Sequence, residues 1–330
     1  MKVLSLFDGI GCGRVAIERC GIPVEQYVAY EIDKKAVNVA LKNYPDIIEK
    51  GDVFNANFED YKGFDLLIGG SPCTYWSIGQ KTEKRETTNS GLGWDLFSQY
   101  VRALEDSGCP YFLYENNYSM DSKIKDEITK AFNKVMESRK NKYPSDSIQY
   151  KASKEIYPIF INSSLVSGQS RKRLYWTNIP CNGNDIMPID KGIKLQDILE
   201  FGYVDRDKSL RITRRYAGMS GVEAFLCRRY FGKSFGQAVF KSKEGRDNIY
   251  ALYKQDQHFD DGTKVEKDIT KRNIRRLTPL ETERLQTLPD NYTKLDSLSD
   301  IKRIELVGNG WTVDVIVHLL KGFERYNNEL

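Results

Sequence analysis

The 330-residue chain carries a formal net charge of +4, and 40% of its residues are hydrophobic and 12% aromatic. This composition suits one large packed domain with a smaller second one, and it excludes a disordered or low-complexity protein. No apolar run approaches the length of a membrane-spanning helix, and the first residues have no signal-peptide pattern. We therefore expect a soluble, cytoplasmic protein that does not bind membranes.

Cysteine usage indicates the chemical environment of the chain. The six cysteines are scattered without a C-x-x-C pair, and the chain has only two histidines. This pattern argues against a structural zinc site and favours a reducing compartment.

The amino-terminal region alternates predicted strands at 3–7, 27–30 and 47–49 with predicted helices at 14–20 and 34–43. A glycine-rich turn at 8–13 follows the first strand and would let the backbone approach a ligand closely. Glu31, at the end of the second strand, fits the position where nucleotide-binding folds hold ribose hydroxyls. The glycine spacing departs from G-x-G-x-x-G because Arg14 stands at the last glycine, which disfavours NAD and leaves another adenosine cofactor open.

A second ligand-binding edge is predicted after residues 64–68, an apolar run typical of a buried parallel strand. Small residues end this strand, and Pro72 restricts the backbone just before Cys73. Cys73 therefore lies where loops of open α/β sheets carry chemistry. An isolated cysteine is usually a buried structural thiol, so the interpretation depends on other polar groups nearby.

Glu115 is the first such group. A long loop, predicted to be mobile, runs to residue 93, and then a helix at 94–107 leads to a buried strand at 111–114 that ends at Glu115. If this strand neighbours 64–68, Glu115 and Cys73 share one edge of the sheet. A carboxylate beside a thiol is costly to bury, but it can hydrogen-bond a substrate when protonated.

Two arginines follow further along the chain. A helix at 121–136, a charged connection at 137–150 and a strand at 156–161 precede a polar loop and a strand at 174–177. Arg171 and Arg173 are two residues apart, so in an extended chain both side chains point to one face.

The positive charge is concentrated in residues 203–276, which hold 18 Lys and Arg residues against 10 Asp and Glu residues. Aromatic residues are interleaved with these charges, as on a polyanion-binding surface. A solvated face of mixed charge is the alternative interpretation.

Taken together, these segments resemble the DNA cytosine-5 methyltransferase family of the prokaryotic or phage type. The matching segments follow the family's order along nearly the whole chain, except in 203–270: FDGIGCG at 7–13, EID at 31–33, GDV at 51–53, GSPC at 70–73, ENN at 115–117, QSRKR at 169–173, RLTPLETERLQ at 276–286 and GNGW at 308–311. The 71–80 stretch also resembles the eukaryotic de novo branch.

The resemblance implies an α/β fold: a Rossmann-like class I S-adenosylmethionine-dependent methyltransferase sheet with a smaller target-recognition domain. Residues 1–202 and 277–330 would form the catalytic domain, and 203–276 the target-recognition domain. The partner would be double-stranded DNA, bound by a monomer in a restriction-modification setting.

The resemblance also implies the catalytic roles. Cys73 would add to carbon 6 of a cytosine flipped out of the duplex, which makes carbon 5 nucleophilic. Glu115 would hydrogen-bond N3 and the exocyclic amine, and Arg173 would contact O2, with Arg171 beside it.

For S-adenosylmethionine, the resemblance places Phe7 and Ile32 near the adenine, although core packing is the alternative for both. It assigns the ribose hydroxyls to Glu31. The remaining implied cofactor-binding residues are Asp8, Gly9, Gly11, Asp52, Val53, Pro72 and Asn309.

One residue departs from the family pattern, because Asn117 stands where the family has valine. If this position packs, its amide must find a partner or cost about 1–3 kcal/mol. His318 is expected to be a core residue. Three alternatives stay open: an RNA cytosine-5 methyltransferase, a catalytically silent DNA-binding module and a nicotinamide oxidoreductase.

Overall fold

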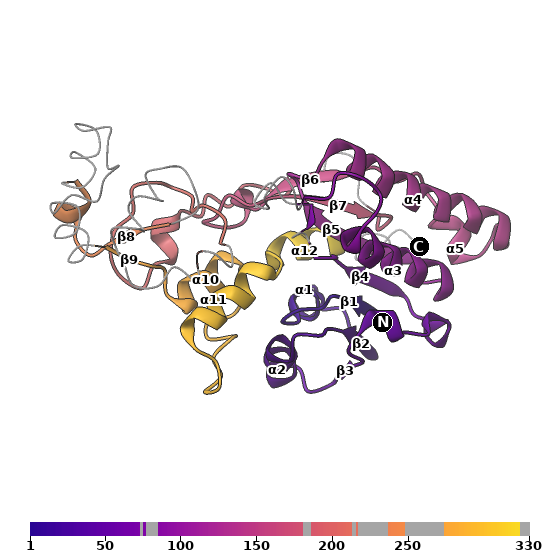
Figure 1. The fold of residues 1–330 in the computed structure, drawn as a ribbon, viewed down its shortest axis with the longest axis horizontal. Helices are drawn as coiled ribbons and strands as arrows, with labels where there is room; N and C mark the ends of the chain where they lie inside the picture. The colour runs from indigo at the N-terminus through magenta and orange to yellow at the C-terminus, as the bar shows by residue number, and fades with distance from the viewer. Residues whose placement is uncertain are drawn as a thin grey trace. The chain divides into compact units, whose positions relative to one another are not determined.

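The computed structural model describes residues 1–72, 75–76, 85–180, 186–212, 216, 237–247 and 274–323. The chain divides into two compact units (Figure 1). The first comprises Met1–Asn162, Lys172–Pro188 and Val315–Leu330, and the second comprises Ser163–Arg171 and Ile189–Asp314.

The first unit is built on a seven-stranded sheet with the order β3-β2-β1-β4-β5-β7-β6. Its strands are β1 (Lys2–Leu6), β2 (Gln26–Tyr30), β3 (Ile47–Glu49), β4 (Leu66–Gly69), β5 (Tyr111–Asn117), β6 (Ile159–Asn162) and β7 (Lys172–Thr177). The first five run parallel, and β7 pairs antiparallel with both β5 and β6. The strand order reverses between β1 and β4, and ligands bind outside the carboxyl ends of strands at such a point.

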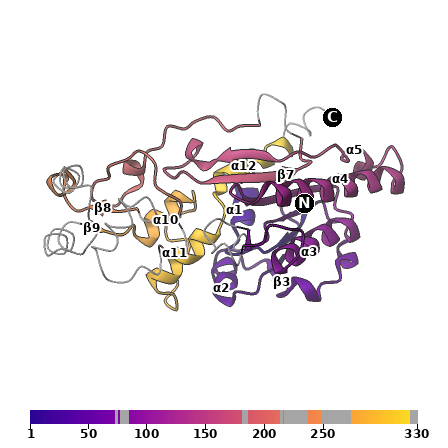
Figure 2. The ribbon, with the colours of Figure 1, turned by 45° about the horizontal axis from the view of Figure 1, so that its top comes forward.

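The central strands β1, β2 and β4 are almost wholly buried, which explains why they are largely apolar runs without alternation. The helices of this unit are α1 (Cys12–Arg19), α2 (Lys34–Asn43), α3 (Leu92–Asp106), α4 (Ser122–Lys142) and α5 (Ile148–Lys151), and most of α12 (Val313–Leu320) also belongs to it. Figure 2 shows α3 and α4 side by side. No helix within the described ranges combines the length and apolar character that a bilayer crossing requires.

Aromatic side chains form the centre of the core in this unit. The ring of Phe132 on α4 stacks on Phe112 of β5 at 4.8 Å between centroids, and Tyr100 of α3 lies 4.9 Å from Tyr114. All four residues are fully buried. The strand β5 is thereby fixed against two helices on this face.

Several predicted elements extend further than expected. Helix α4 continues to Lys142, whereas a connection was predicted from residue 137. Although the sequence there is charged, Arg139 is buried. Its side chain donates hydrogen bonds to the carbonyls of Leu104 (2.8 Å) and Cys109 (2.7 Å). Strand β5 continues to Asn117 because β7 pairs with its polar end.

Other predicted elements match closely. The observed α2 and β3 have the predicted bounds, and α2 is capped by Asp33, whose side chain accepts a hydrogen bond from the Lys35 amide at 2.9 Å. The strand predicted at 156–161 begins later, at Ile159. The α/β fold class with an open, mostly parallel sheet is confirmed.

The second unit has its own apolar core around β8 (Val239–Phe240), β9 (Ile274–Arg275), α10 (Pro279–Leu285) and α11 (Asp300–Asn309). Helix α10 starts with a capping box in which Thr278 and Glu281 satisfy each other's backbone amides. Glu281 also binds Arg275 at 2.6 Å. The segment 277–314 packs within this unit. The predicted division into a catalytic domain and a target-recognition domain at 203–276 is a functional one and stays a prediction.

Candidate active site

The carboxyl ends of β4 and β5 lie side by side, as the sequence interpretation required. Gly69 at the end of β4 pairs with Tyr114, so residues 70–72 leave the sheet next to Glu115. Cys73 itself lies outside the described residues and directly follows the described Pro72. The structure therefore traces the chain to one residue before the predicted nucleophile.

Ser71 ties this loop to β5. Its hydroxyl lies 2.6 Å from the hydroxyl of Tyr114, and the side-chain amide of Asn116 donates to its backbone carbonyl at 3.2 Å. All three residues are buried. The chain just before Cys73 is thus held by the side chains of the residues that precede and follow Glu115 in the sequence.

Glu115 forms a nearly buried ion pair with Arg173. The Arg173 Nε lies 2.6 Å from Glu115 Oε1, and the two side chains are 9% and 12% exposed. Strand pairing causes this contact, because Arg173 on β7 stands opposite Asn117 and shares a face with Glu115. The two predicted substrate-contacting groups are brought together at one strand end.

Arg171 has different partners. It precedes β7, and its guanidinium donates to the carbonyls of Gly308 (3.1 Å) and Gly310 (2.9 Å) at the carboxyl end of α11. Helix ends favour such a cation because their last carbonyls are unpaired. The two-residue spacing predicted that both arginine side chains point to one face. In the structure Arg173 contacts Glu115, whereas Arg171 contacts the end of α11. Asn309 is the exposed last residue of α11 and belongs to the second unit.

A second group of polar contacts joins the ends of β1 and β2. Glu31 accepts hydrogen bonds from the amides of Ile32 and Asp33, both at 2.8 Å, and from the amide of Gly9 at 2.9 Å. Asp8 accepts from the hydroxyls of Ser5 and Tyr27 through one oxygen, while its other oxygen is buried and has no hydrogen-bond partner among the described residues. Burial raises the pKa of both carboxyls.

The apolar residues at this edge are placed as a ligand surface would require. Ile32 is 74% exposed, which excludes core packing for its side chain. Phe7 is half-buried against the core and has φ of 58°, a conformation that is strained for a residue with a side chain. Gly9 has φ of 62° and open space where a Cβ would stand.

The GDV segment at 51–53, which follows β3, places one polar side chain at the surface and one apolar side chain in the core. Asp52 is exposed and accepts a hydrogen bond from the Phe54 amide at 3.0 Å, which starts the short helix η1 (Val53–Asn55). Val53 packs in the core, so its side chain has a structural role.

Sequence reasoning missed Glu49 at the end of β3. Burial, and then the charges of Asp8 and Glu31, raise its pKa to about 8. Both its carboxyl oxygens are buried and have no hydrogen-bond partner in the described part of the chain. Strand alternation is the signal that would have found it, because Glu49 shares a face with the buried Ile47.

Asn117, the departure from the family pattern, is buried and satisfied. Its side-chain amide donates to Asn116 Oδ1 at 3.3 Å, and its oxygen accepts from the Ser119 hydroxyl at 2.7 Å. The expected penalty for an unpaired amide is therefore avoided. His318 is half-buried, and its Nε2 lies 3.2 Å from the Ile186 carbonyl oxygen.

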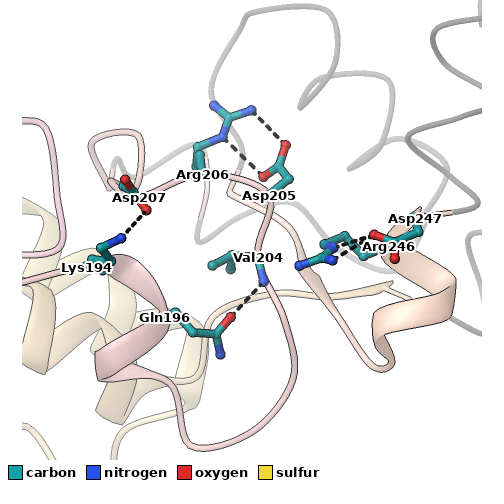
Figure 3. Close-up of a pocket in the computed structure, with 8 residues that line it drawn as sticks. All are labelled: Lys194, Gln196, Val204, Asp205, Arg206, Asp207, Arg246 and Asp247. Carbon is teal, nitrogen blue, oxygen red and sulfur yellow. Dashed lines mark hydrogen bonds and ion pairs between the residues drawn. The ribbon is translucent and has the colours of Figure 1, made fainter.

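The second unit contains a cavity of about 540 Å³ (Figure 3). Its charges are paired within the lining: Lys194 with Asp207 at 3.4 Å, Arg206 with Asp205 at 3.3 Å, and Arg246 with Asp247 at 2.8 Å. Equal numbers of cations and anions do not form a phosphate-binding surface, so we assign no ligand to this cavity. Among the described residues, no His, Cys, Asp and Glu side chains form a group that could hold a metal.

The strand order and the polar groups at its switch point define an open, Rossmann-like α/β fold with a candidate ligand-binding edge. The family model for C-5 cytosine-specific DNA methylases matches residues 1–325, and the chain belongs to this family. The resemblance inferred from the sequence motifs is thereby confirmed, and a nicotinamide oxidoreductase is set aside.

Similar proteins cover the chain to different extents. The type II methyltransferases M.NlaX of Neisseria lactamica and M1.ScrFI of Lactococcus lactis subsp. cremoris are 26% and 25% identical, over 96% of this chain in each case and over 93% and 76% of their own lengths. The orphan methyltransferase M.SPRI of Bacillus phage SPR is 36% identical over 118 residues, and the match spans 26% of its length.

Solved structures share the fold. The S. pombe Dnmt2 methyltransferase has a TM-score of 0.66 at 16% identity, with 99% of both chains covered. A putative DNA modification methyltransferase encoded within an E. coli prophage has a TM-score of 0.58 at 18% identity, also with 99% of both chains covered.

The raised pKa of Glu49 predicts how stability depends on pH. Between the ordinary glutamate value of 4.5 and about 8, the folded protein binds more protons here than the unfolded chain, so stability falls as pH rises through this window. We expect Glu49→Gln to unfold at a higher temperature than the wild type at pH 8.5, and to show little difference at pH 5. Melting curves from pH 5 to 9 measure this. Glu105, an exposed residue on α3, provides the control. Glu105→Gln should melt at the wild-type temperature at both pH 5 and pH 8.5.

Proposed function

We propose that the protein transfers a methyl group from S-adenosylmethionine to carbon 5 of a cytosine flipped out of double-stranded DNA. The observation that carries the proposal is the nearly buried Glu115–Arg173 pair, placed beside the strand whose following loop leads to Cys73. Membership of the C-5 cytosine-specific DNA methylase family supports the reaction and the substrate.

The chemistry requires a nucleophile, a hydrogen-bonding carboxyl group and a cation. Carbon 5 of cytosine is a weak nucleophile, so the Cys73 thiolate first forms a bond to carbon 6 and pushes electrons toward carbon 5. Glu115 hydrogen-bonds the ring at N3 and the amine, and Arg173 neutralises charge near O2. After carbon 5 gains the methyl group, it gives its proton to water. The electrons of the broken C5–H bond re-form the C5–C6 double bond and expel the thiolate from carbon 6, which restores the cytosine ring and the enzyme.

The residues after β1 and β2 fit S-adenosylmethionine, which supplies an electrophilic methyl group when bound. The exposed Ile32 offers an apolar face for an adenine, and Glu31 beside it is a hydrogen-bond acceptor for ribose hydroxyls. Open space at Gly9, and the Asp8 oxygen that has no hydrogen-bond partner among the described residues, support a place for a polar ligand at the same edge. Phe7, Gly11, Asp52 and Pro72 complete the part of the proposed cofactor site that lies in the first unit, and Val53 would contribute through its backbone. The predicted role of Asn309, in the second unit, stays a prediction.

The substrate and the nucleophile can be tested together. We expect release of tritium from carbon 5 of cytosine in duplex DNA, and a covalent adduct with DNA that contains 5-fluorocytosine, because fluorine cannot leave as a proton does. Cys73→Ala should abolish both. Tritium release from tRNA without release from DNA would establish an RNA methyltransferase. Binding of DNA with neither signal would indicate a silent binding module.

Glu115→Gln should slow adduct formation by about 10²- to 10⁴-fold, because the variant loses a positioned acid. It also leaves the Arg173 charge uncompensated, so its melting temperature should fall. Glu283→Gln is the matched control, since it breaks the buried pair of Glu283 with Arg303 (3.0 Å) in the second unit. That variant should lose stability but form the adduct at the wild-type rate per folded molecule. Equal slowing in both variants would assign Glu115 a structural role.

Ile32→Ala should weaken S-adenosylmethionine binding by about tenfold, since covering an isoleucine side chain contributes about 1.5–3 kcal/mol. Its stability should change by less than about 0.5 kcal/mol, because the side chain is exposed in the free protein. Calorimetric titration and thermal melting measure the two quantities. Ile189→Ala, which also removes an exposed isoleucine, should alter neither. Unchanged affinity in Ile32→Ala would remove this residue from the cofactor site.

A further inference from the structure

We infer that Tyr114 is a positioning residue for the nucleophile and that it acts through Ser71 and Asn116 to hold the loop that carries Cys73. The inference rests on the proposed function, because it assumes that Cys73 is the nucleophile. It concerns a buried hydrogen-bond network that ends two residues before Cys73 in the sequence.

The hydroxyl of Tyr114 is the centre of this network. It lies 2.6 Å from the Ser71 hydroxyl and accepts a hydrogen bond from the Asn116 side-chain amide at 3.1 Å. The same amide donates to the Ser71 carbonyl at 3.2 Å. Ser71 is thus held through both its side chain and its backbone.

The position of the Tyr114 hydroxyl is fixed by the aromatic core. The tyrosine ring lies 4.9 Å from Tyr100, 5.3 Å from Phe97, 5.6 Å from Phe132 and 5.8 Å from Trp176, measured between centroids. Burial raises the pKa of Tyr114, so its hydroxyl stays protonated. A neutral hydroxyl held by the buried aromatic core therefore anchors the loop.

The orientation of Asn116 is set in turn by Asn117. Asn116 Oδ1 accepts from the Asn117 backbone amide at 2.8 Å and from its side-chain amide at 3.3 Å. This fixes the amide so that its nitrogen faces Ser71 and Tyr114. The unusual residue at 117 therefore supports the loop by orienting its neighbour.

Strand alternation keeps the two tasks of β5 separate. Tyr114 and Asn116 point to one face of the sheet and hold the loop, whereas Glu115 points to the other face and binds Arg173. A second anchor lies where the chain returns, because Arg85 donates to the Ser119 carbonyl at 3.0 Å. The chain before and after the predicted nucleophile is thus tied to residues at or just past the end of β5.

Tyr114→Phe against Tyr100→Phe tests the inference. Tyr100 is equally buried, and its hydroxyl donates to the Leu67 and Leu113 carbonyls at 3.1 and 2.9 Å. Within the described part of the chain, this hydroxyl makes no hydrogen bond to the loop after β4. Both variants lose one buried hydroxyl and should lose similar stability. We expect Tyr114→Phe to slow adduct formation with 5-fluorocytosine DNA at least tenfold, with KM values for DNA and S-adenosylmethionine within threefold of wild type. Tyr100→Phe should react at the wild-type rate.

Two further measurements separate the possible outcomes. Ser71→Ala should slow the reaction like Tyr114→Phe, and the double variant should be no slower than either single one, because both remove the same contact. Iodoacetamide labelling of Cys73, followed by peptide mass spectrometry across pH, reports the thiol without DNA. We expect its rate to change at least threefold in Tyr114→Phe and to stay unchanged in Tyr100→Phe.

An equal effect of Tyr114→Phe and Tyr100→Phe on labelling and adduct formation would overturn the inference, and so would no effect of Tyr114→Phe. Failure of the proposed function looks different, because the wild-type protein itself would then form no adduct. The labelling comparison still decides the positioning role in that case.

Discussion

The parallel pairing of β4 with β1 on one side and β5 on the other is the constraint on which the rest of the site depends. Parallel strands bring their carboxyl ends to one edge, so loops that are distant in sequence become neighbours there. The turn after β1 and the loop after β4 leave the sheet at the point where strand order reverses. The proposed cofactor site and the loop that leads to Cys73 thus begin at neighbouring strand ends.

Buried polar groups at this edge are mostly satisfied by partners that strand pairing supplies. Glu115 gains Arg173 from β7, and Glu31 gains the amide of Gly9 from the turn after β1. Glu49 is different, because burial leaves its carboxyl without a donor among the described residues and raises its pKa. Carboxyls with perturbed pKa values are often found beside ligand sites, in agreement with the cofactor position proposed above.

The sequence was sufficient to predict the strands and turns whose patterns are local. The apolar strand predicted at 64–68, observed as Leu66–Gly69, and the helix at Lys34–Asn43 needed no tertiary information. Longer-range contacts were not predictable: the buried Arg139 looked like part of a charged connection, and the partners of Arg171 come from a helix far along the chain. Cys73 and most of 203–276 lie outside the described residues, so the nucleophile and the DNA-binding segment remain predictions.

The two-faced character of β5 limits how this strand can change. A deletion of one residue within it would turn each following side chain to the opposite face, so Glu115 would trade places with its neighbours. The loop before Cys73 would then lose its anchor, and the candidate active site would lose its acid. Length changes in this protein should therefore be confined to the connections that precede and follow the strand.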